Sequence, residues 1–512
     1  MKPLPLGRQD FASLIQDGCL YVDKTQHIHQ LIQGKYYFLS RPRRFGKSLL
    51  LSTLEELFRG NQKVFKNLWI EDKYDWQKQH PVIKISFNTI PYKRFGLQEA
   101  LDKHMIELVQ KYGLSSTYKD AGTIFKGLIE KLAEDQEQGV VILIDEYDKP
   151  IIDYVDDVPQ AQENRDILKS FYSVLKDSDK YLRFLLITGV SKFSKVSIFS
   201  DLNNLEDITL DDRYNDLLGI TEKELDDYFS GQLSLLQNKY EEYFLDTRQK
   251  IEEQYLGYSW NGRDFVYNPF VLLNLFKKNQ FGSYWFQSGT PTFLMKLIRE
   301  QRYTAFDLEN LTVFESSFDK YEVDNISLVS LLFQTGYLTI KAANPVDGTF
   351  RLDYPNQEVE RAFTIHLLAN MNGGKIDNAN IILYQLTDSL RNDHIEKFMQ
   401  LLTELFKSIA YPLIDNKEKY YHSIFFLVIK MLGFNIESEI MTIDGRIDCV
   451  LKTKARIYVI EFKTGNTQKA IEQIRQKGYH HKYTSDSRPV KLFGIDFDAE
   501  NKQIANWILE NA

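Results

Sequence analysis

Cysteine is nearly absent from this sequence, which holds only Cys19 and Cys449. Two cysteines cannot form a disulfide framework or a cysteine-rich metal site, so a reducing, cytoplasmic setting is expected. Long apolar runs are also missing, because the stretch at residues 423–430 is far shorter than the ~20 residues of a membrane-spanning helix. The N-terminus lacks the apolar segment of a secretory signal. We therefore expect neither export nor contact with a membrane.

Positive charge is not in excess either. The chain has 63 Lys and Arg against 71 Asp and Glu, a net charge of −8, which excludes a polycationic coat for nucleic acid. A local basic channel stays possible, and residues 411–512 are the less acidic part, with 15 basic and 13 acidic residues. At 512 residues and 43% hydrophobic content, the composition is that of a globular protein of about two to four domains.

The N-terminal part of the chain alternates short apolar runs with helical patterns. Strands are predicted within residues 36–40, 81–87, 139–148 and 183–189, and a helix over residues 47–58. Unbroken runs of Val, Ile and Leu indicate strands that are covered on both faces. The alternation therefore predicts a mostly parallel α/β sheet.

Helical patterns dominate the middle of the chain. A helical pattern covers about residues 215–315. A capping box near its start has Thr221 as the cap, followed three positions later by Glu224. Between residues 320 and 365 a helix leads into a two-stranded hairpin. This order is typical of a winged-helix module, but a hairpin that only packs on helices fits equally well.

The sequence RPRRFGKS at residues 41–48 lies between a predicted strand and a predicted helix. Its end matches the phosphate-loop pattern, whereas Arg41 replaces the first glycine of that pattern. A helix N-terminus directs free N–H groups at an anion, Lys47 can reach the β and γ phosphates, and Ser48 can hold Mg²⁺. Arginines at positions 41, 43 and 44 add positive charge. The expected nucleotide-binding residues of this loop are Arg43, Arg44, Phe45, Gly46, Lys47 and Ser48.

Two acids, Asp145 and Glu146, end an apolar strand about 100 residues later. The carboxyl ends of parallel strands form the ligand-binding edge of such a sheet. There Asp145 can support Mg²⁺, and Glu146 can orient and deprotonate the attacking water. Thr188 ends the next predicted strand and either senses the γ-phosphate or only makes a turn. A solvated strand end is the alternative for Asp145, Glu146 and Asp148, but the pairing of these acids with the Gly-Lys-Ser motif favours nucleotide binding.

These motifs resemble the AAA-ATPase-like family of bacterial P-loop proteins. The matching segments are YVDKT at 21–25, RPRRFGKS at 41–48, ILIDEYD at 142–148, TGVSKFSKVSIFSDLNN at 188–204, YNPF at 267–270 and SGTPTFL at 288–294. The family also accepts arginine in place of the first loop glycine, as at Arg41. The resemblance implies an ATPase, and such proteins are often fused to a C-terminal PD-(D/E)XK nuclease-like domain.

A second group of charged residues lies on a predicted hairpin, residues 445–463. If residues 452–455 form its turn, residue 448 opposes residue 459, and Asp448, Glu461 and Lys463 share one face. The two carboxylates can bind Mg²⁺ or Mn²⁺, and Lys463 can stabilise developing negative charge. The alternative is a cross-strand ion-pair face on an exposed sheet.

The helices predicted on either side of this hairpin add two accessory residues. Glu418, near the start of the helix at 416–434, could act as an additional metal ligand, and Gln473, in the helix at 467–483, could bond to the active-site backbone or a water. Lys477 shares a face with Gln473 and could contact a phosphate. The order of elements resembles the PD-(D/E)XK fold, in which Asp448, Glu461 and Lys463 match the catalytic positions and Glu418 and Gln473 match accessory positions.

The two resemblances together imply an α/β protein. Its expected parts are a P-loop AAA-ATPase-like domain at 1–215, a helical lid at 216–315, a helical or winged-helix-like region at 316–395, and a PD-(D/E)XK, restriction-endonuclease-like domain at 396–512.

We therefore predict an ATP-binding and ATP-hydrolysing protein that uses Mg²⁺ or Mn²⁺ and whose nuclease-like domain acts on DNA or RNA, with DNA favoured. ATP would gate access to the nucleic acid by changing the arrangement of the domains. Two alternatives stay open: a non-nucleolytic, ATP-dependent regulatory or interaction protein, and a working ATPase with an inactive nuclease domain. A homo-oligomeric state is also left open.

Overall fold

The computed structural model divides the chain into two compact units. The first unit comprises residues 1–288 and 310–359, and the second comprises residues 289–309 and 360–512. The structure describes residues 1–192, 198–199, 202, 204–285, 294, 311–319, 321–322, 325–371, 376–408, 425–426, 428–429, 432, 434–442, 445–463, 465–498 and 503–512.

A five-stranded parallel sheet forms the centre of the first unit, in the order β2-β3-β4-β1-β5. Its strands are the apolar runs of the N-terminal sequence, and every residue of β1 and β3 is buried. The mostly parallel α/β sheet expected from the sequence is confirmed. The strands are β1 (Tyr36–Ser40), β2 (Val82–Ser86), β3 (Val140–Asp145), β4 (Leu182–Gly189) and β5 (Glu206–Asp207).

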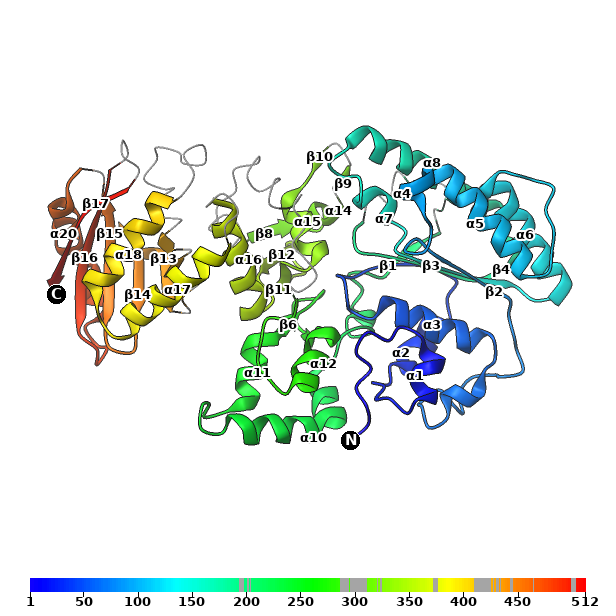
Figure 1. Ribbon diagram of the computed structural model, residues 1–512, viewed down its shortest axis with the longest axis horizontal. Coiled ribbons are helices and arrows are strands. Elements are labelled where there is room, and N and C mark those ends of the chain that lie inside the picture. Colours follow the sequence, from blue (N-terminus) through cyan, green and yellow to red (C-terminus); the bar gives the residue numbers. More distant parts are fainter. Residues whose placement is uncertain are drawn as a thin grey trace. The chain divides into compact units, whose positions relative to one another are not determined.

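Helices cover both faces of this sheet. Figure 1 shows α1, α2 and α3 on one face and α5, α6 and α8 on the other. The helices are α1 (Phe11–Gln16), α2 (Thr25–Leu31), α3 (Lys47–Phe58), α4 (Tyr92–Phe95), α5 (Leu97–Lys111), α6 (Ala121–Gln136), α7 (Lys149–Ile152) and α8 (Val158–Asp177), with 3₁₀ turns η1 (Gln62–Phe65), η2 (Asp179–Tyr181) and η3 (Asp212–Tyr214).

A helical segment, residues 222–278, follows the sheet. The predicted capping box is confirmed, since the Thr221 hydroxyl accepts from the Glu224 N–H and the Glu224 carboxylate accepts from the Thr221 N–H. Buried side chains such as Phe229 and Leu272 form the core of the segment. Its elements are α10 (Glu222–Tyr240), α11 (Thr247–Tyr255), β6 (Leu256–Tyr258), β7 (Val266–Tyr267) and α12 (Pro269–Lys278).

The predicted hairpin at residues 339–353 is also present, and it belongs to the first unit. A third strand, β8, extends it to the order β11-β12-β8. The C-cap of helix α15 is Gly336, whose φ of +88° and lack of a side chain allow close approach to Pro42. The elements are β8 (Leu311–Phe314), α14 (Ser316–Asp319), β9 (Tyr321–Glu322), β10 (Asn325–Ile326), α15 (Leu328–Thr335), β11 (Thr339–Asn344) and β12 (Thr349–Asp353).

The second unit is built on a mixed sheet in the order β13-β14-β15-β16-β17, in which only β15 and β16 run parallel. Helix α20 lies on one face and α17 and α18 lie on the other (Figure 1). The elements are α16 (Gln357–Met371), which begins in the first unit, α17 (Ile376–Arg391), α18 (Ile395–Ser408), β13 (Asn435–Thr442), β14 (Gly445–Lys452), β15 (Ile457–Lys463), α20 (Thr467–Gln476), η7 (Tyr479–Tyr483), β16 (Val490–Asp498) and β17 (Gln503–Asn511).

Two details of the second unit differ from the sequence-based expectation. The hairpin turn is residues 453–456, closed by a hydrogen bond from the Thr453 N–H to the Arg456 carbonyl, so Val450 and not residue 448 faces Val459. Helix α20 ends at Gln476 instead of continuing to residue 483, because Gly478 takes a left-handed conformation there.

Candidate functional sites

The phosphate-loop sequence lies at the start of α3, directly after β1. Gly46 is the N-cap, with a φ of +96°, and a Cβ added at this position would have a Leu218 carbon, 3.9 Å away, as its nearest neighbour. The backbone is therefore open to close approach by a ligand. The first N–H groups of α3 lack partners within the helix, which suits them to an anion.

The other loop residues divide between the surface and the core. Arg43 is exposed, whereas the Arg44 guanidinium packs 3.8 Å from the centre of the Phe270 ring. Phe45 is buried and meets the edges of Tyr258 and Trp260. The positive charge expected from Arg41 does not lie at the surface of the loop, because Arg41 is only 1% exposed.

Lys47 is buried at the centre of the loop. Its Nζ donates hydrogen bonds to the carbonyls of Arg41, at 2.8 Å, and Pro42, at 3.0 Å. Burial lowers the pKa of the Lys47 ammonium, while the nearby carboxylates of Asp145 and Glu146 oppose that shift. The structure thus brings together the lysine and the acids, which lie about 100 positions apart in the sequence.

A chain of hydrogen bonds joins the first turn of α3 to the ends of β3 and β4. The Ser48 hydroxyl donates to Asp145 Oδ2 at 2.6 Å, and the Thr188 hydroxyl donates to Asp145 Oδ1 at 2.9 Å. Asp145 and Thr188 are both buried. A hydroxyl and a carboxylate oxygen this close together are hard donors of the kind that Mg²⁺ prefers, so Ser48 and Asp145 fit that ion.

The two acids that follow Asp145 have different surroundings. Glu146 has a φ of +52°, which is strained for a residue other than glycine, and its side chain is half-buried. Asp148 is buried, and its carboxylate accepts from the N–H groups of Val190 and Ser191 and from the Ser191 hydroxyl. A solvated strand end, the alternative considered for these acids, is therefore wrong for Asp148 and for Asp145. The sequence did not predict these hydrogen bonds, which join Asp148 to the two residues that follow β4.

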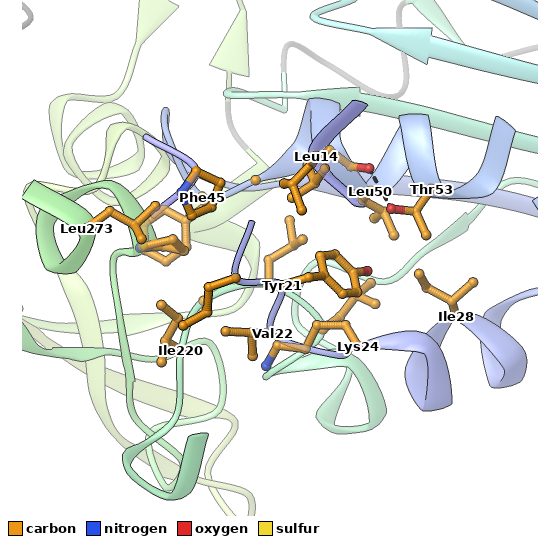
Figure 2. A pocket seen from close by; sticks show the side chains of 18 of the residues that line it. Leu14, Tyr21, Val22, Lys24, Ile28, Phe45, Leu50, Thr53, Ile220 and Leu273 are labelled. Atoms are coloured by element: carbon orange, nitrogen blue, oxygen red, sulfur yellow. Dashed lines mark hydrogen bonds between the residues drawn. The ribbon is translucent and has the colours of Figure 1, made fainter. Parts of the chain in front are cut away.

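An apolar cavity of about 110 Å³ opens beside Gly46. Figure 2 shows the Tyr21 ring facing Leu50 and Thr53 of α3, with Val22 and Ile220 close by. One wall is thus the YVDKT segment, a second is α3, and a third is the helical segment. The Lys24 ammonium ties the first wall to the third through Glu224 and the Asp216 carbonyl.

The C-terminal candidate residues come from β14 and β15. Cys449 pairs with Ile460, and this register, continued by one residue, places Asp448 opposite Glu461. The Phe462 N–H donates to Asp448 Oδ2 at 2.9 Å, and Lys463 Nζ lies 3.3 Å from Glu461 Oε1. Asp448, Glu461 and Lys463 therefore share one face, although the pairing differs by two residues from the one expected. The face survives that shift because side chains alternate with a period of two.

Glu461 is the most constrained of these residues. It is 1% exposed, and its Oε2 has no hydrogen-bond partner in the described part of the chain. Burial, and then the Asp448 carboxylate, raise the pKa of Glu461 to about 7. A buried carboxylate oxygen without a partner, next to a second carboxylate, fits a divalent cation.

Only these two carboxylates are in place for such an ion within the described ranges. Among the residues that the structure describes, no group of three or more His, Cys, Asp or Glu side chains is placed to hold a metal. Glu418, the expected additional ligand, lies outside the described residues.

Helix α20 covers the face that carries Glu461. Gln473 donates a hydrogen bond from Nε2 to Glu461 Oε1, which is a different partner from the active-site backbone or water expected from the sequence. Gly494, which pairs with Glu461 on β16, permits this approach because an added Cβ would meet the Thr467 carbonyl at 2.8 Å. Lys477 is exposed at the C-cap of α20. No local pattern signals the role of Gly494, which depends on packing between distant elements.

Replacing Glu461 by Gln should stabilise the metal-free protein at alkaline pH. A carboxylate whose folded-state pKa is raised from 4.5 to about 7 favours folding at low pH, and this contribution is lost as the pH rises through 7. At about pH 8, E461Q should therefore raise the unfolding free energy by on the order of 2 kcal/mol, and much less at about pH 4. Urea unfolding in a chelator measures this, and the control is E510Q, because Glu510 lies on β17 and pairs with Arg475.

Equal effects of E461Q at both pH values would contradict the burial of a charged carboxylate. Added Mn²⁺ should reverse the order at alkaline pH, because the ion stabilises the folded state only where both carboxylates are present.

Comparisons with known proteins match both parts of the chain that carry these residues. The family model described as "Predicted AAA-ATPase" matches residues 5–199, and the model of the PD-(D/E)XK nuclease superfamily matches residues 416–507. The chain is 39% identical over 528 residues to the uncharacterized protein in the vnfD 5′ region of Azotobacter chroococcum mcd 1, with 100% of this chain and 99% of that protein covered. No solved structure matches. Among the described helices, none has the length and apolar character to span a membrane.

Proposed function

Because this chain belongs to the AAA-ATPase-like family and carries a C-terminal domain of the PD-(D/E)XK nuclease superfamily, we propose that it binds and hydrolyses ATP and cleaves nucleic-acid phosphodiesters. The observation that carries the proposal is the hydrogen-bonded chain Ser48–Asp145–Thr188 beside buried Lys47. The same residues would be scattered if each motif had occurred by chance.

ATP fits the first site through its phosphates and its base. The N–H groups of α3 and the Lys47 ammonium would bind the β and γ phosphates, with Arg43 and Arg44 adding positive charge. Glu146 would take the proton of the attacking water. The apolar cavity beside Gly46, which the Tyr21 ring lines, would hold the base (Figure 2).

Phosphodiester cleavage fits the second site. Asp448 and Glu461 would hold a divalent cation, and Ser48 and Asp145 would hold one at the first site. Such an ion, Mg²⁺ or Mn²⁺, supplies Lewis acidity and offsets the charge of the phosphate. Lys463 would stabilise negative charge that develops on the scissile phosphate, and Gln473 keeps Glu461 in place. DNA is the favoured substrate, with RNA as the other candidate.

Glu146→Gln should separate ATP binding from hydrolysis. The substitution removes the general base but keeps the size of the side chain, so we expect ATP affinity to stay within about threefold and turnover to fall roughly 100-fold. Equilibrium binding and phosphate release measure the two effects. E163Q, on the exposed side of α8, is the control. Wild-type turnover in E146Q would exclude Glu146 as the base.

The same variant tests whether ATP controls cleavage. E146Q should hold the ATP-bound state, so its Mn²⁺-dependent cleavage of DNA should differ between ATP and ADP. Cleavage that does not respond to either nucleotide would contradict gating.

The second candidate function is that of a non-nucleolytic, ATP-dependent regulatory or interaction protein. It is favoured by the presence of only two carboxylates at the C-terminal site among the described residues. Wild-type protein that binds Mn²⁺ but cleaves neither DNA nor RNA would support it.

A further inference from the structure

Arg41 stands where the phosphate-loop pattern has its first glycine, and its side chain is enclosed by protein. It is 1% exposed. Its Nη1 donates to the carbonyls of Ser40, at 3.0 Å, and Thr209, at 2.7 Å, and its Nη2 donates to the Tyr214 carbonyl at 3.1 Å. The guanidinium therefore joins the end of β1 to the segment that leads into the helical segment. It cannot touch a phosphate in this arrangement.

Trp260 completes the enclosure. The Arg41 guanidinium lies 3.9 Å from the centre of a Trp260 ring, and the Phe45 ring meets Trp260 edge-on at 5.4 Å. The backbone N–H of Trp260 donates a hydrogen bond to Asn215 Oδ1 at 2.9 Å, which fixes the backbone of the tryptophan. Arg41 and Phe45, which lie on the two sides of the turn in the loop, thus both pack on the Trp260 indole.

The backbone of Arg41 contacts the phosphate-binding lysine. Lys47 Nζ donates hydrogen bonds to the carbonyls of Arg41 and Pro42. The enclosed guanidinium fixes the position of Arg41, and Gly336, which lies outside the loop, packs closely on Pro42. A shift of Arg41 would therefore move the carbonyls that orient Lys47. The side chain acts on the ligand site through the backbone of its own residue.

Burial of a charge without a directly bonded carboxylate is unfavourable, so this arrangement needs compensation. Burial lowers the pKa of Arg41 to about 9, and the Asp207 carboxylate favours the charged form. The guanidinium is thus still protonated at neutral pH. Three carbonyl acceptors and an aromatic face provide the compensation.

We propose that Arg41 is a positioning residue, which braces the phosphate loop against the segment 209–214 and Trp260 and thereby sets the affinity for the phosphates of ATP. The proposal rests on the proposed nucleotide site. It also accounts for arginine at this position: glycine there would satisfy the loop pattern but would leave three carbonyls and an indole without their partner.

The experiment compares R41G and R41M with R183M in the full chain. Arg183 is a matched control, because its guanidinium also bonds to carbonyls, those of Ile32 and Gly34, and packs on Phe58, but at the opposite end of β4 from Thr188. ATP affinity is measured at a temperature at which circular dichroism shows each variant to be folded. R41G and R41M should bind ATP roughly 10- to 100-fold more weakly, whereas R183M should bind it within about twofold of wild type.

Conservative and double variants separate positioning from stability. R41K should recover part of the affinity, since an ammonium keeps the charge but cannot bond to three carbonyls and stack at once. W260L should weaken ATP binding in the same direction, and R41M with W260L should be less than additive because the two residues form one unit.

Wild-type ATP affinity in folded R41G and R41M would overturn the proposal, as would an equal loss in R183M. Failure of the wild-type protein to bind ATP would instead overturn the proposed nucleotide site, so the two failures are distinct.

Discussion

Lys47→Ala should abolish ATP binding at micromolar nucleotide, with a loss in affinity on the order of 1,000-fold. Lys47 Nζ is held between the carbonyls of Arg41 and Pro42, at 2.8 and 3.0 Å, so its charge is already in place before a ligand arrives. A preorganised charge in a buried site contributes more than one in water, because the surroundings need no reorganisation. Calorimetric titration with ATP and Mg²⁺ measures the loss.

Lys103→Ala is the control for that experiment. Lys103 is an exposed lysine on α5 that pairs with Glu99, and surface pairs of this kind contribute little. Unchanged ATP affinity in folded K47A would exclude the loop at residues 41–48 as the phosphate site.

Asp448→Asn should eliminate cleavage and Mn²⁺ binding together, with cleavage falling by on the order of 1,000-fold. Asparagine keeps the shape and can still accept from the Phe462 N–H, whereas the negative charge is removed. Loss of one of two carboxylates leaves Glu461 alone with a divalent ion. Cleavage of DNA and RNA and calorimetric titration with Mn²⁺ measure the two effects.

Asp486→Asn is the matched control in the same unit, since Asp486 pairs with Arg488 at the opposite end of β16 from Asp496. D448N that still binds Mn²⁺ would exclude the metal site, and cleavage that persists in folded D448N would assign it to other residues. In the wild type, Mn²⁺ affinity should rise with pH up to about 7, because the proton on Glu461 competes with the ion.

The elements that position both sites follow from local sequence patterns. The apolar runs predict β1 and β3, and the Gly-Lys-Ser motif before an amphipathic stretch predicts the start of α3 at Lys47. The shared face of Asp448 and Glu461 is also predictable, although the expected turn lies one residue before the observed one. Side chains alternate between the two faces of a strand, so a pairing shifted by two residues still leaves Asp448 and Glu461 on one face.

Other features could not be read from the sequence because they depend on contacts between distant residues. Nothing local to Arg41 reveals that its partners are the carbonyls of residues 209 and 214 and the ring of Trp260. The burial of Asp148 likewise depends on the return of the chain after β4. The end of α20, by contrast, could have been predicted from the sequence, because Gly478 is a local signal. Its left-handed backbone ends the helix although the helical pattern continues beyond it.

The close approach of Gly336 to Pro42 has a consequence for how the protein is made. Pro42 is synthesised early, yet the residue that covers it emerges from the ribosome only after the chain has left the first unit at residue 288 and returned at residue 310. Pro42 therefore lacks this neighbour until Gly336 has been synthesised. Contacts of such long sequence separation form slowly, so we expect the contact between Gly336 and Pro42 to form late in folding.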